Sequence, residues 1–284
     1  MNLDKLEHYR KRILLYIVID VIIMLPIIFI AIINHQVFSI IPLIAIFAFV
    51  LYSVLTGKNA KEFHKLYSQT LTNLLEQKNI EIAMNGFSYN EINDDSVLYL
   101  SENCHYPDYE SDYKMSLKHN KRNFKQSFVK ISFKYKYYDL SRKDISYKTA
   151  ILFNGRYIKI DLLNNIPYEY TITNDSFVLK NKINEKTITN IKSKENQYKI
   201  YFDRTKESED YLNNELIAKI DNITKLINSK VLYHIKDNKL ITCINNKKKI
   251  FFPNLSKKHT INYMESVINK ELDFIYDLLN SIQI

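Results

Sequence analysis

Two long apolar segments stand at the start of the chain. Residues 13–33 are apolar apart from Asp20, and residues 37–55 are predominantly apolar again, with only residues 34–36 between them. About 20 apolar residues in a helix span the ~30 Å hydrocarbon core of a bilayer, where lipid offers no partners for free backbone groups. The pattern therefore predicts a transmembrane helical hairpin, with residues 1–57 forming a two-helix membrane anchor.

Two other interpretations of these segments are weaker. A cleavable signal peptide is disfavoured because the first run is long, lacks a small-residue cleavage pattern and is followed at once by a second run. A buried hairpin of a soluble core is disfavoured because neither segment shows the polar stripe of a soluble amphipathic helix.

The cationic flanks predict the orientation of the anchor. Lys and Arg cluster outside both outer ends of the hairpin, and the turn at 34–36 contains none: Lys5, Arg10, Lys11, Arg12, Lys58, Lys61 and Lys65. Such residues remain on the cytoplasmic side of a membrane. We therefore expect two spans in the cell membrane with both termini cytoplasmic.

Asp20 is the one charged residue inside either span. An acid at this depth is a functional candidate by default. Because neither span holds a second charged group for a relay, a helix–helix contact that fixes packing is favoured. Ion or proton transport through Asp20 is the alternative.

The pattern behind the anchor changes to that of a polar domain, residues 58–284. Apolar residues recur at helical spacing over 58–76, which predicts an amphipathic stalk helix ending near residue 78. The same spacing predicts helices over 209–228 and 260–281. The segment 90–125 is polar and irregular, and it is expected to be surface loop with short elements.

Strand patterns lie between these helices. Residues 127–138 alternate apolar and polar positions, which is typical of an antiparallel strand with one wet face. The run 145–163 alternates likewise and contains Asn154-Gly155, a turn or a bulge. Asp237-Asn238 suits a two-residue primed turn between strands 231–236 and 239–244. Shorter strands are expected at 177–179 and 197–202.

Strands and helices are segregated along the chain rather than alternating regularly. This arrangement predicts an α+β fold with a mainly antiparallel sheet and packed helices.

Composition narrows the partners and the chemistry. The formal net charge of +9 is spread along the chain, with lysine clusters at 247–249 and 257–258. A basic domain at the inner leaflet is attracted to anionic lipid, whereas nucleic acid is the other interpretation of such charge. The tether favours lipid headgroups or another protein.

Glycine and cysteine are scarce. Three glycines are too few for a P-loop, a dinucleotide fingerprint or a kinase-type glycine loop, so no cofactor is indicated. Cys104 and Cys243 suit a reducing compartment and provide no disulfide scaffold.

Several segments resemble one family. The run 151–161, with its aromatic-glycine-aromatic strand, is similar to a bacterial family of uncharacterised membrane proteins, domain-of-unknown-function family 3137. The strand 198–201 with the helix around Leu216 resembles the family's strand-then-helix segment, and the hairpin 231–244 with the closing segment 252–255 resembles its C-terminal signature. The likeness extends over about residues 60–284. It implies an architecture and a membrane location, but no activity.

A cysteine–histidine pair is the most specific candidate chemistry. The predicted hairpin register pairs His234 with Ile241 and Leu232 with Cys243, so His234 and Cys243 lie diagonally on one face. Such a pair can activate a thiolate. A packed thiol beside a half-buried histidine is the commoner arrangement, and we favour it because no third orienting residue is evident.

Other sites have weaker signals. Histidine and cysteine spacings match no zinc motif, so no metal site is predicted. Asp108, Glu110 and Asp112 alternate in an expected loop that lacks the glycine and terminal glutamate of a calcium loop. The strand 128–138 interleaves lysines and aromatics as an RNA-binding sheet does, but most of its aromatics share one face and its lysines the other. Nucleic acid is therefore disfavoured.

The leading hypothesis is a membrane-anchored, non-enzymatic module that binds a protein or anionic lipid headgroups. A hydrolase-like enzyme built on the polar residues near 108–112 is one alternative. Transport through Asp20 is the other.

Overall fold

The structure is a computed structural model of the 284-residue chain. It describes residues 3–33, 37–83, 85–95, 98, 108–139, 141, 144–164, 166–177, 179, 183, 186–193, 196–212, 216–246, 251 and 253–282. The chain divides into two compact units: residues 1–78 with 251–270, and residues 79–250 with 271–284.

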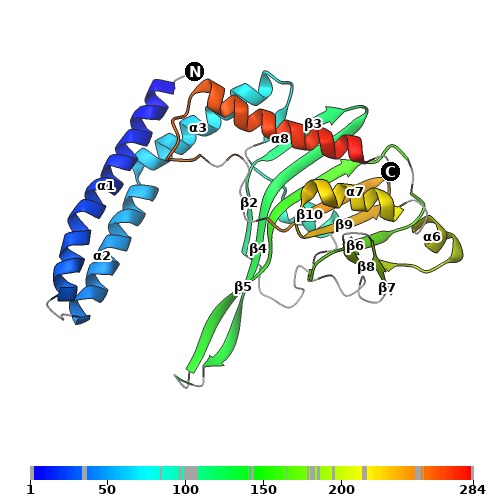
Figure 1. Ribbon diagram of the computed structural model, residues 1–284, viewed down its shortest axis with the longest axis horizontal. Helices are drawn as coiled ribbons and strands as arrows, with labels where there is room; N and C mark the ends of the chain where they lie inside the picture. Colours follow the sequence, from blue (N-terminus) through cyan, green and yellow to red (C-terminus); the bar gives the residue numbers. More distant parts are fainter. Residues whose placement is uncertain are drawn as a thin grey trace. The chain divides into compact units, whose positions relative to one another are not determined.

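The first unit is helical. Helices α1 (Leu3–Ile33) and α2 (Val37–Thr56) run side by side, and α3 (Lys58–Glu76) follows them (Figure 1). Two helical stretches of the described chain are long and apolar enough to cross a membrane: Leu3–Ile33, which is α1, and Ile41–Glu76, whose apolar part lies in α2. Their most apolar windows are 17% and 0% buried, unlike the core helix of a soluble protein. In α3, Phe63, Leu71 and Leu75 form a buried stripe, which confirms the amphipathic helix.

A polar cluster joins the start of α1 to the segment before the last helix. Glu7 Oε1 accepts the backbone N–H of His259 at 2.7 Å, and Glu7 Oε2 forms an ion pair with Arg10. Nη1 of Arg10 donates to the Leu255 carbonyl at 2.9 Å. The buried His259 ring meets Phe63 edge to face at a centroid distance of 5.5 Å. Residues 252 positions apart in the chain thus form one buried contact.

The second unit is built on an antiparallel sheet of ten strands (Figure 1). The strand order is β1-β3-β4-β5-β10-β9-β6-β8-β7, and β2 pairs with β4. The strands are β1 (Glu81–Ala83), β2 (Asp108–Ser111), β3 (Lys114–His119), β4 (Arg122–Asp139), β5 (Asp144–Asp161), β6 (Tyr170–Thr173), β7 (Thr187–Lys192), β8 (Gln197–Phe202), β9 (Val231–Lys236) and β10 (Lys239–Ile244). The described helices of this second unit are α4 (Tyr89–Asp95), α6 (Lys206–Tyr211), α7 (Ile217–Ile227) and the second half of α8 (Ile261–Ser281).

Helices cover both faces of this sheet. On one face α7 contributes Thr224, 2.9 Å from the Tyr233 hydroxyl, and α8 contributes Glu271, which pairs with Arg156 at 2.9 Å. The other face carries a hydrophobic cluster that includes Ile92 of α4 and Cys243 of β10. The predicted α+β fold with an antiparallel sheet is therefore confirmed.

Local predictions differ in outcome. The hairpin 231–244 is confirmed in register, and Asp237 and Asn238 both adopt positive φ, as a primed turn requires. Strand 197–202 and the last helix are also confirmed. Of the helix expected at 209–228, the structure describes α6, which begins earlier at Lys206, and α7; residues 213–215 between them lie outside the described residues.

The polar segment 90–125 was expected to be mostly loop, and this is wrong for its second half. It contains β2 and β3, and β4 begins at Arg122. β3 does alternate, with Met115 and Leu117 buried between more exposed polar residues, but the run is short and β2 before it is wholly polar apart from Tyr109. Of the strand expected at 177–179, residue 178 is outside the described part, and Leu179 forms an isolated bridge with Leu98.

Asn154-Gly155 is neither a turn nor a bulge. Both residues pair in register with β4, and the irregularity lies instead between Ile131 and Ser132. A Cβ on Gly155 would collide with the backbone carbonyl of Ile244. Glycine is required here because a neighbouring backbone approaches closely.

Candidate functional site

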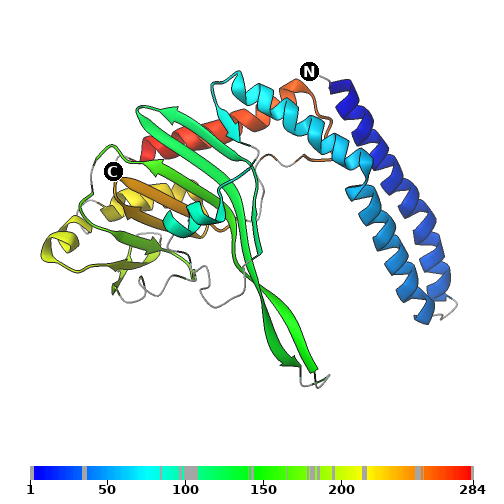
Figure 2. The same cartoon turned by 180° about the vertical axis from the view of Figure 1, so that it is seen from behind.

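The longest two strands of the sheet extend beyond it. The first half of β4 pairs with β3 and β2, and the second half of β5 pairs with β10. Within the described residues, 133–139 and 144–150 pair only with one another. They form a two-stranded ribbon that projects from the sheet (Figure 2).

One face of this ribbon combines aromatic, aliphatic and cationic side chains. Antiparallel partners share a face, and the register places together Lys134, Lys136, Tyr138, Ile145, Tyr147 and Ile151. We name this set the tyrosine–lysine face. Its four apolar members are all more than half exposed, with Tyr147 at 63%.

Local contacts order this face. The Lys136 ammonium lies 5.8 Å from the centre of the Tyr147 ring, within the range of a cation–π interaction. The Lys134 ammonium is 3.9 Å from Asp108 of β2. Both lysines nevertheless remain exposed and able to meet a partner.

The opposite face of the ribbon is less accessible near the sheet. Phe133 is half-buried and contacts the Tyr135 ring at a centroid distance of 5.8 Å. Tyr135 is 40% exposed, and Lys148 on the paired strand is exposed. Beyond Ser132, the described side chains on both faces of the ribbon are more exposed than those in the core part of the sheet.

The alternation in β4 predicted lysines on one face and most aromatics on the other. The structure keeps that alternation, with Tyr138 on the lysine side, and the paired strand adds Tyr147 and Ile145 to the same side. The earlier argument against nucleic acid considered β4 without its partner strand. The mixed face depends on the register between β4 and β5. The sequence between residues 139 and 144 contains no tight-turn signal that would predict this register.

The structure places His234 and Cys243 on one face of the β9–β10 hairpin, as the predicted register required. Their environments differ from those of a catalytic dyad. Cys243 lies in the hydrophobic core, and burial raises the pKa of its thiol, which opposes thiolate formation. His234 Nδ1 lies 3.0 Å from Thr171 Oγ1, and its Nε2 lies 3.9 Å from Glu169.

Glu169 organises a polar network that the sequence did not reveal. Its carboxylate pairs with Lys186 at 3.1 Å and with Lys236 at 3.5 Å. Burial alone raises the pKa of Glu169, but the hydrogen bond and charge of Lys186, with the charges of His234 and Lys236, lower it further than burial raises it. Thr171 is 1% exposed, so its hydroxyl is closed to a substrate and the network holds β6 against β9.

Asp20 lies on a buried strip of α1 and is 7% exposed. Its Oδ2 has no hydrogen-bond partner among the described residues. Tyr52 of α2, a potential partner, is 66% exposed. A carboxyl buried between apolar helices fits a packing contact, and a relay needs successive polar groups.

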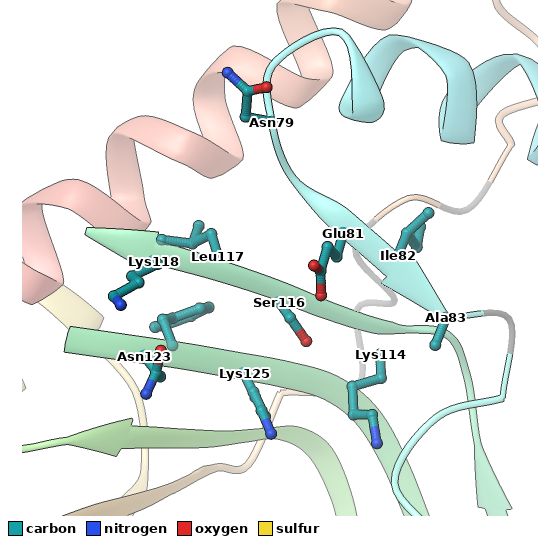
Figure 3. Close-up of a pocket in the computed structure, with 11 residues that line it drawn as sticks. Asn79, Glu81, Ile82, Ala83, Lys114, Ser116, Leu117, Lys118, Asn123 and Lys125 are labelled. Carbon is teal, nitrogen blue, oxygen red and sulfur yellow. The ribbon is translucent and has the colours of Figure 1, made fainter. Parts of the chain in front are cut away.

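A cavity of about 540 Å³ lies over β1, β3 and β4 (Figure 3). Lys114, Lys118 and Lys125 extend from its floor, and Lys114 forms an ion pair with Glu91 at 3.2 Å. Among the described lining residues Glu81 is the one acid, so no second carboxylate is present for paired acid–base chemistry. The described residues also contain no group of three His, Cys, Asp or Glu suited to a metal ion.

Two of the three acidic residues near 108–112 are strand residues, whereas Asp112 lies in the connection between β2 and β3. Asp108 and Glu110 belong to β2, and Glu110 pairs with Lys130 at 2.9 Å. The carboxylates follow a strand and meet lysines of β4, so they do not converge on a common point. The lysine cluster at 247–249 and Cys104 lie outside the described residues.

Comparison with protein families identifies one segment of the chain. Residues 151–284 match the family described as Protein of unknown function (DUF3137), which confirms the resemblance over that segment. It begins at Ile151, directly after the ribbon, and contains Gly155, the β9–β10 hairpin and α8. No curated protein and no solved structure matches the chain.

Proposed function

We propose that this chain, whose residues 151–284 belong to the DUF3137 family, is a membrane-anchored, non-enzymatic binding module of a bacterial cell membrane. Residues 13–33 and 37–55 cross the bilayer, and both termini are cytoplasmic. The apolar, exposed surfaces of α1 and α2 and the cationic flanks support this arrangement. The second unit then works at the inner surface of the membrane.

The tyrosine–lysine face carries the proposal of binding. A contiguous exposed patch of large apolar side chains is uncommon on a soluble domain, and such patches mark interaction sites. Here Tyr138, Ile145 and Tyr147 line one side of a ribbon that has no other strand beside it in the described structure, and Ile151 continues that side at the base of the ribbon. The proposed partner is a protein or anionic lipid, and the ribbon is the element that meets it.

The orientation is tested by cysteine labelling of the full chain in a Cys104→Ser background, with buried Cys243 retained. We expect Thr149→Cys on the ribbon and Lys5→Cys at the amino end to react with an impermeant maleimide in inside-out vesicles alone. His35→Cys, between the spans, is the matched control and reacts from outside sealed cells. Labelling of Thr149→Cys on intact cells contradicts the proposal.

The binding role is tested by photo-cross-linking in cells. Tyr147→benzoylphenylalanine is expected to capture a partner, whereas Ile188→benzoylphenylalanine, an exposed position on β7, captures none. Equal yields at the two positions would remove the ribbon from the proposal.

Transport through Asp20 is a second candidate, favoured by one observation. Its buried Oδ2 lacks a hydrogen-bond partner in the described structure, and buried polar atoms of this kind are costly. Asp20→Asn abolishes ion-dependent flux in proteoliposomes if the carboxyl carries an ion. Unchanged flux assigns Asp20 to helix packing.

A further inference from the structure

The ribbon carries more positive than negative charge. Its two strands, residues 133–139 and 144–150, contain three Lys, two Asp and no Glu, and the sequence between them adds one Arg and one Lys. Lys134 and Lys136 extend from the same face as Tyr138, Ile145 and Tyr147. Cationic ends and amphipathic rings therefore alternate within one small surface.

We propose that the tyrosine–lysine face binds the headgroup region of an anionic bilayer. Tyr138, Ile145 and Tyr147 enter the boundary between headgroups and acyl chains, and Lys134 and Lys136 meet the lipid phosphates. The inference rests on the proposed function, because the anchor places the second unit beside a membrane. It adds a second, peripheral contact to the two spans.

The chemistry of the face matches that of a membrane interface. Tyrosine is enriched at the level of the headgroups, where its ring is partly buried and its hydroxyl remains wet. Lysine buries its aliphatic stem and keeps its ammonium at the charged surface. Anionic lipid attracts such groups, and the attraction is weakened by salt.

Other occupants fit this face less well. Lysine is depleted at protein–protein interfaces, whereas two lysines lie within this face. A second copy of the ribbon would bring these lysines against their own counterparts, with like charges opposed. Nucleic acid needs a series of exposed rings for base stacking, but two of the four apolar members are isoleucines.

The tether makes a weak contact sufficient. Spans in the same chain hold the second unit near the bilayer, so that insertion of the ribbon is an intramolecular step at high effective concentration. A small amphipathic surface can then remain bound without the apolar area that a free protein requires.

The absence of tryptophan allows a single-probe test on the full chain. Tyr147→Trp and Ile188→Trp each introduce one indole, the first on the ribbon and the second on an exposed position of β7. Each variant is placed in nanodiscs of phosphatidylcholine alone or with about one third phosphatidylglycerol, with and without brominated acyl chains. Bromine quenches an indole that enters the boundary region.

We expect bromolipid quenching of Tyr147→Trp in anionic nanodiscs to be at least about twice that of Ile188→Trp, and to fall as salt is raised. Adding Lys134→Glu and Lys136→Glu should reduce it to the Ile188→Trp level. Lys192→Glu with Lys199→Glu, two exposed lysines of β7 and β8, is the matched charge change and should leave it unaltered. Thermal melts show that each variant is folded.

Quenching that is equal at the two positions, or independent of anionic lipid, overturns the inference. In that case the cross-linking at position 147 separates the two proposals. Capture of a protein leaves the proposed function intact with a protein partner, and capture of RNA assigns a nucleic-acid partner. Capture of nothing removes the binding function as well.

Discussion

The two halves of the β4–β5 pair have similar alternating sequences and opposite environments. Near the sheet centre, Ile131, Phe153 and Tyr157 are at most 2% exposed, because strands and helices cover them. In the ribbon, Tyr138 and Tyr147 are 58% and 63% exposed. Alternation thus decides which side chains share a face, and only neighbouring elements decide whether that face is dry.

The charges of the two halves differ in the same way. Arg156 donates to both carboxylate oxygens of Glu271, whose side chain is 8% exposed. Lys134 and Asp108 form a longer contact with both side chains more than half exposed. The first pair fixes α8 on the sheet, and the second is open to exchange with a partner.

The largest expected effect breaks the buried pair. Glu271→Ala leaves the largely buried guanidinium of Arg156 without its carboxylate, and we expect a loss of about 3 kcal/mol in the free energy of unfolding. Asp108→Ala, the exposed counterpart, should cost less than about 1 kcal/mol. Urea unfolding of the full chain in detergent, followed by circular dichroism, measures both. Similar costs for the two would show that burial does not separate these charges.

The apolar contrast is tested by a pair of isoleucines on the two halves. Ile131→Ala empties a site in the core, so we expect a loss of about 3 kcal/mol. Ile151→Ala, which is 55% exposed, should change stability by about 0.5 kcal/mol or less. The same unfolding measurement applies. A large cost at Ile151 would mean that the ribbon is packed in the free protein.

Gly155→Ala tests the difference between the covered part of the β4–β5 pair and the ribbon with a single added methyl group. The added Cβ meets the Ile244 carbonyl, and displacing that backbone should cost about 2 kcal/mol. Thr149→Val on the ribbon is expected to stay within about 0.5 kcal/mol of the native chain. A stable Gly155→Ala protein would contradict the close approach of β10 at this position.

The smallest expected effect is a change of stability with pH, which should arise in the first unit and not in the ribbon. Burial, with the charge of Arg10, lowers the pKa of His259 from 6.5, and the opposing influence of Glu7 does not offset it. The unfolded chain then binds more protons than the folded chain below about pH 6.5, so stability falls as the pH drops from 7.5 to 5.5.

This loss should appear as a lower melting temperature at pH 5.5. His259→Phe should remove part of the difference, and the rest belongs to His64, because burial lowers its pKa as well. The ribbon segment 132–152 has no histidine, so its lipid-dependent quenching should not change over this range. A melting temperature independent of pH would place His259 in contact with water.

Local chemistry determined several elements of this protein. The hairpin at 231–244 follows from alternation and from two residues that tolerate positive φ, and α8 follows from apolar spacing over six turns. The apolar runs at the amino end likewise determine two long helices, because their length and apolar composition are local properties of the sequence.

Tertiary structure decided the rest, because the deciding contacts join distant residues. Glu271 meets Arg156 across 115 positions, and Glu7 meets His259 across 252, with no local pattern that marks either pair. The mixed face of the ribbon depends on which residue of β5 lies opposite Lys136, and that register is set by the sheet that holds both strands. Side-chain type and spacing are local properties, whereas burial and register depend on what the rest of the chain places beside them.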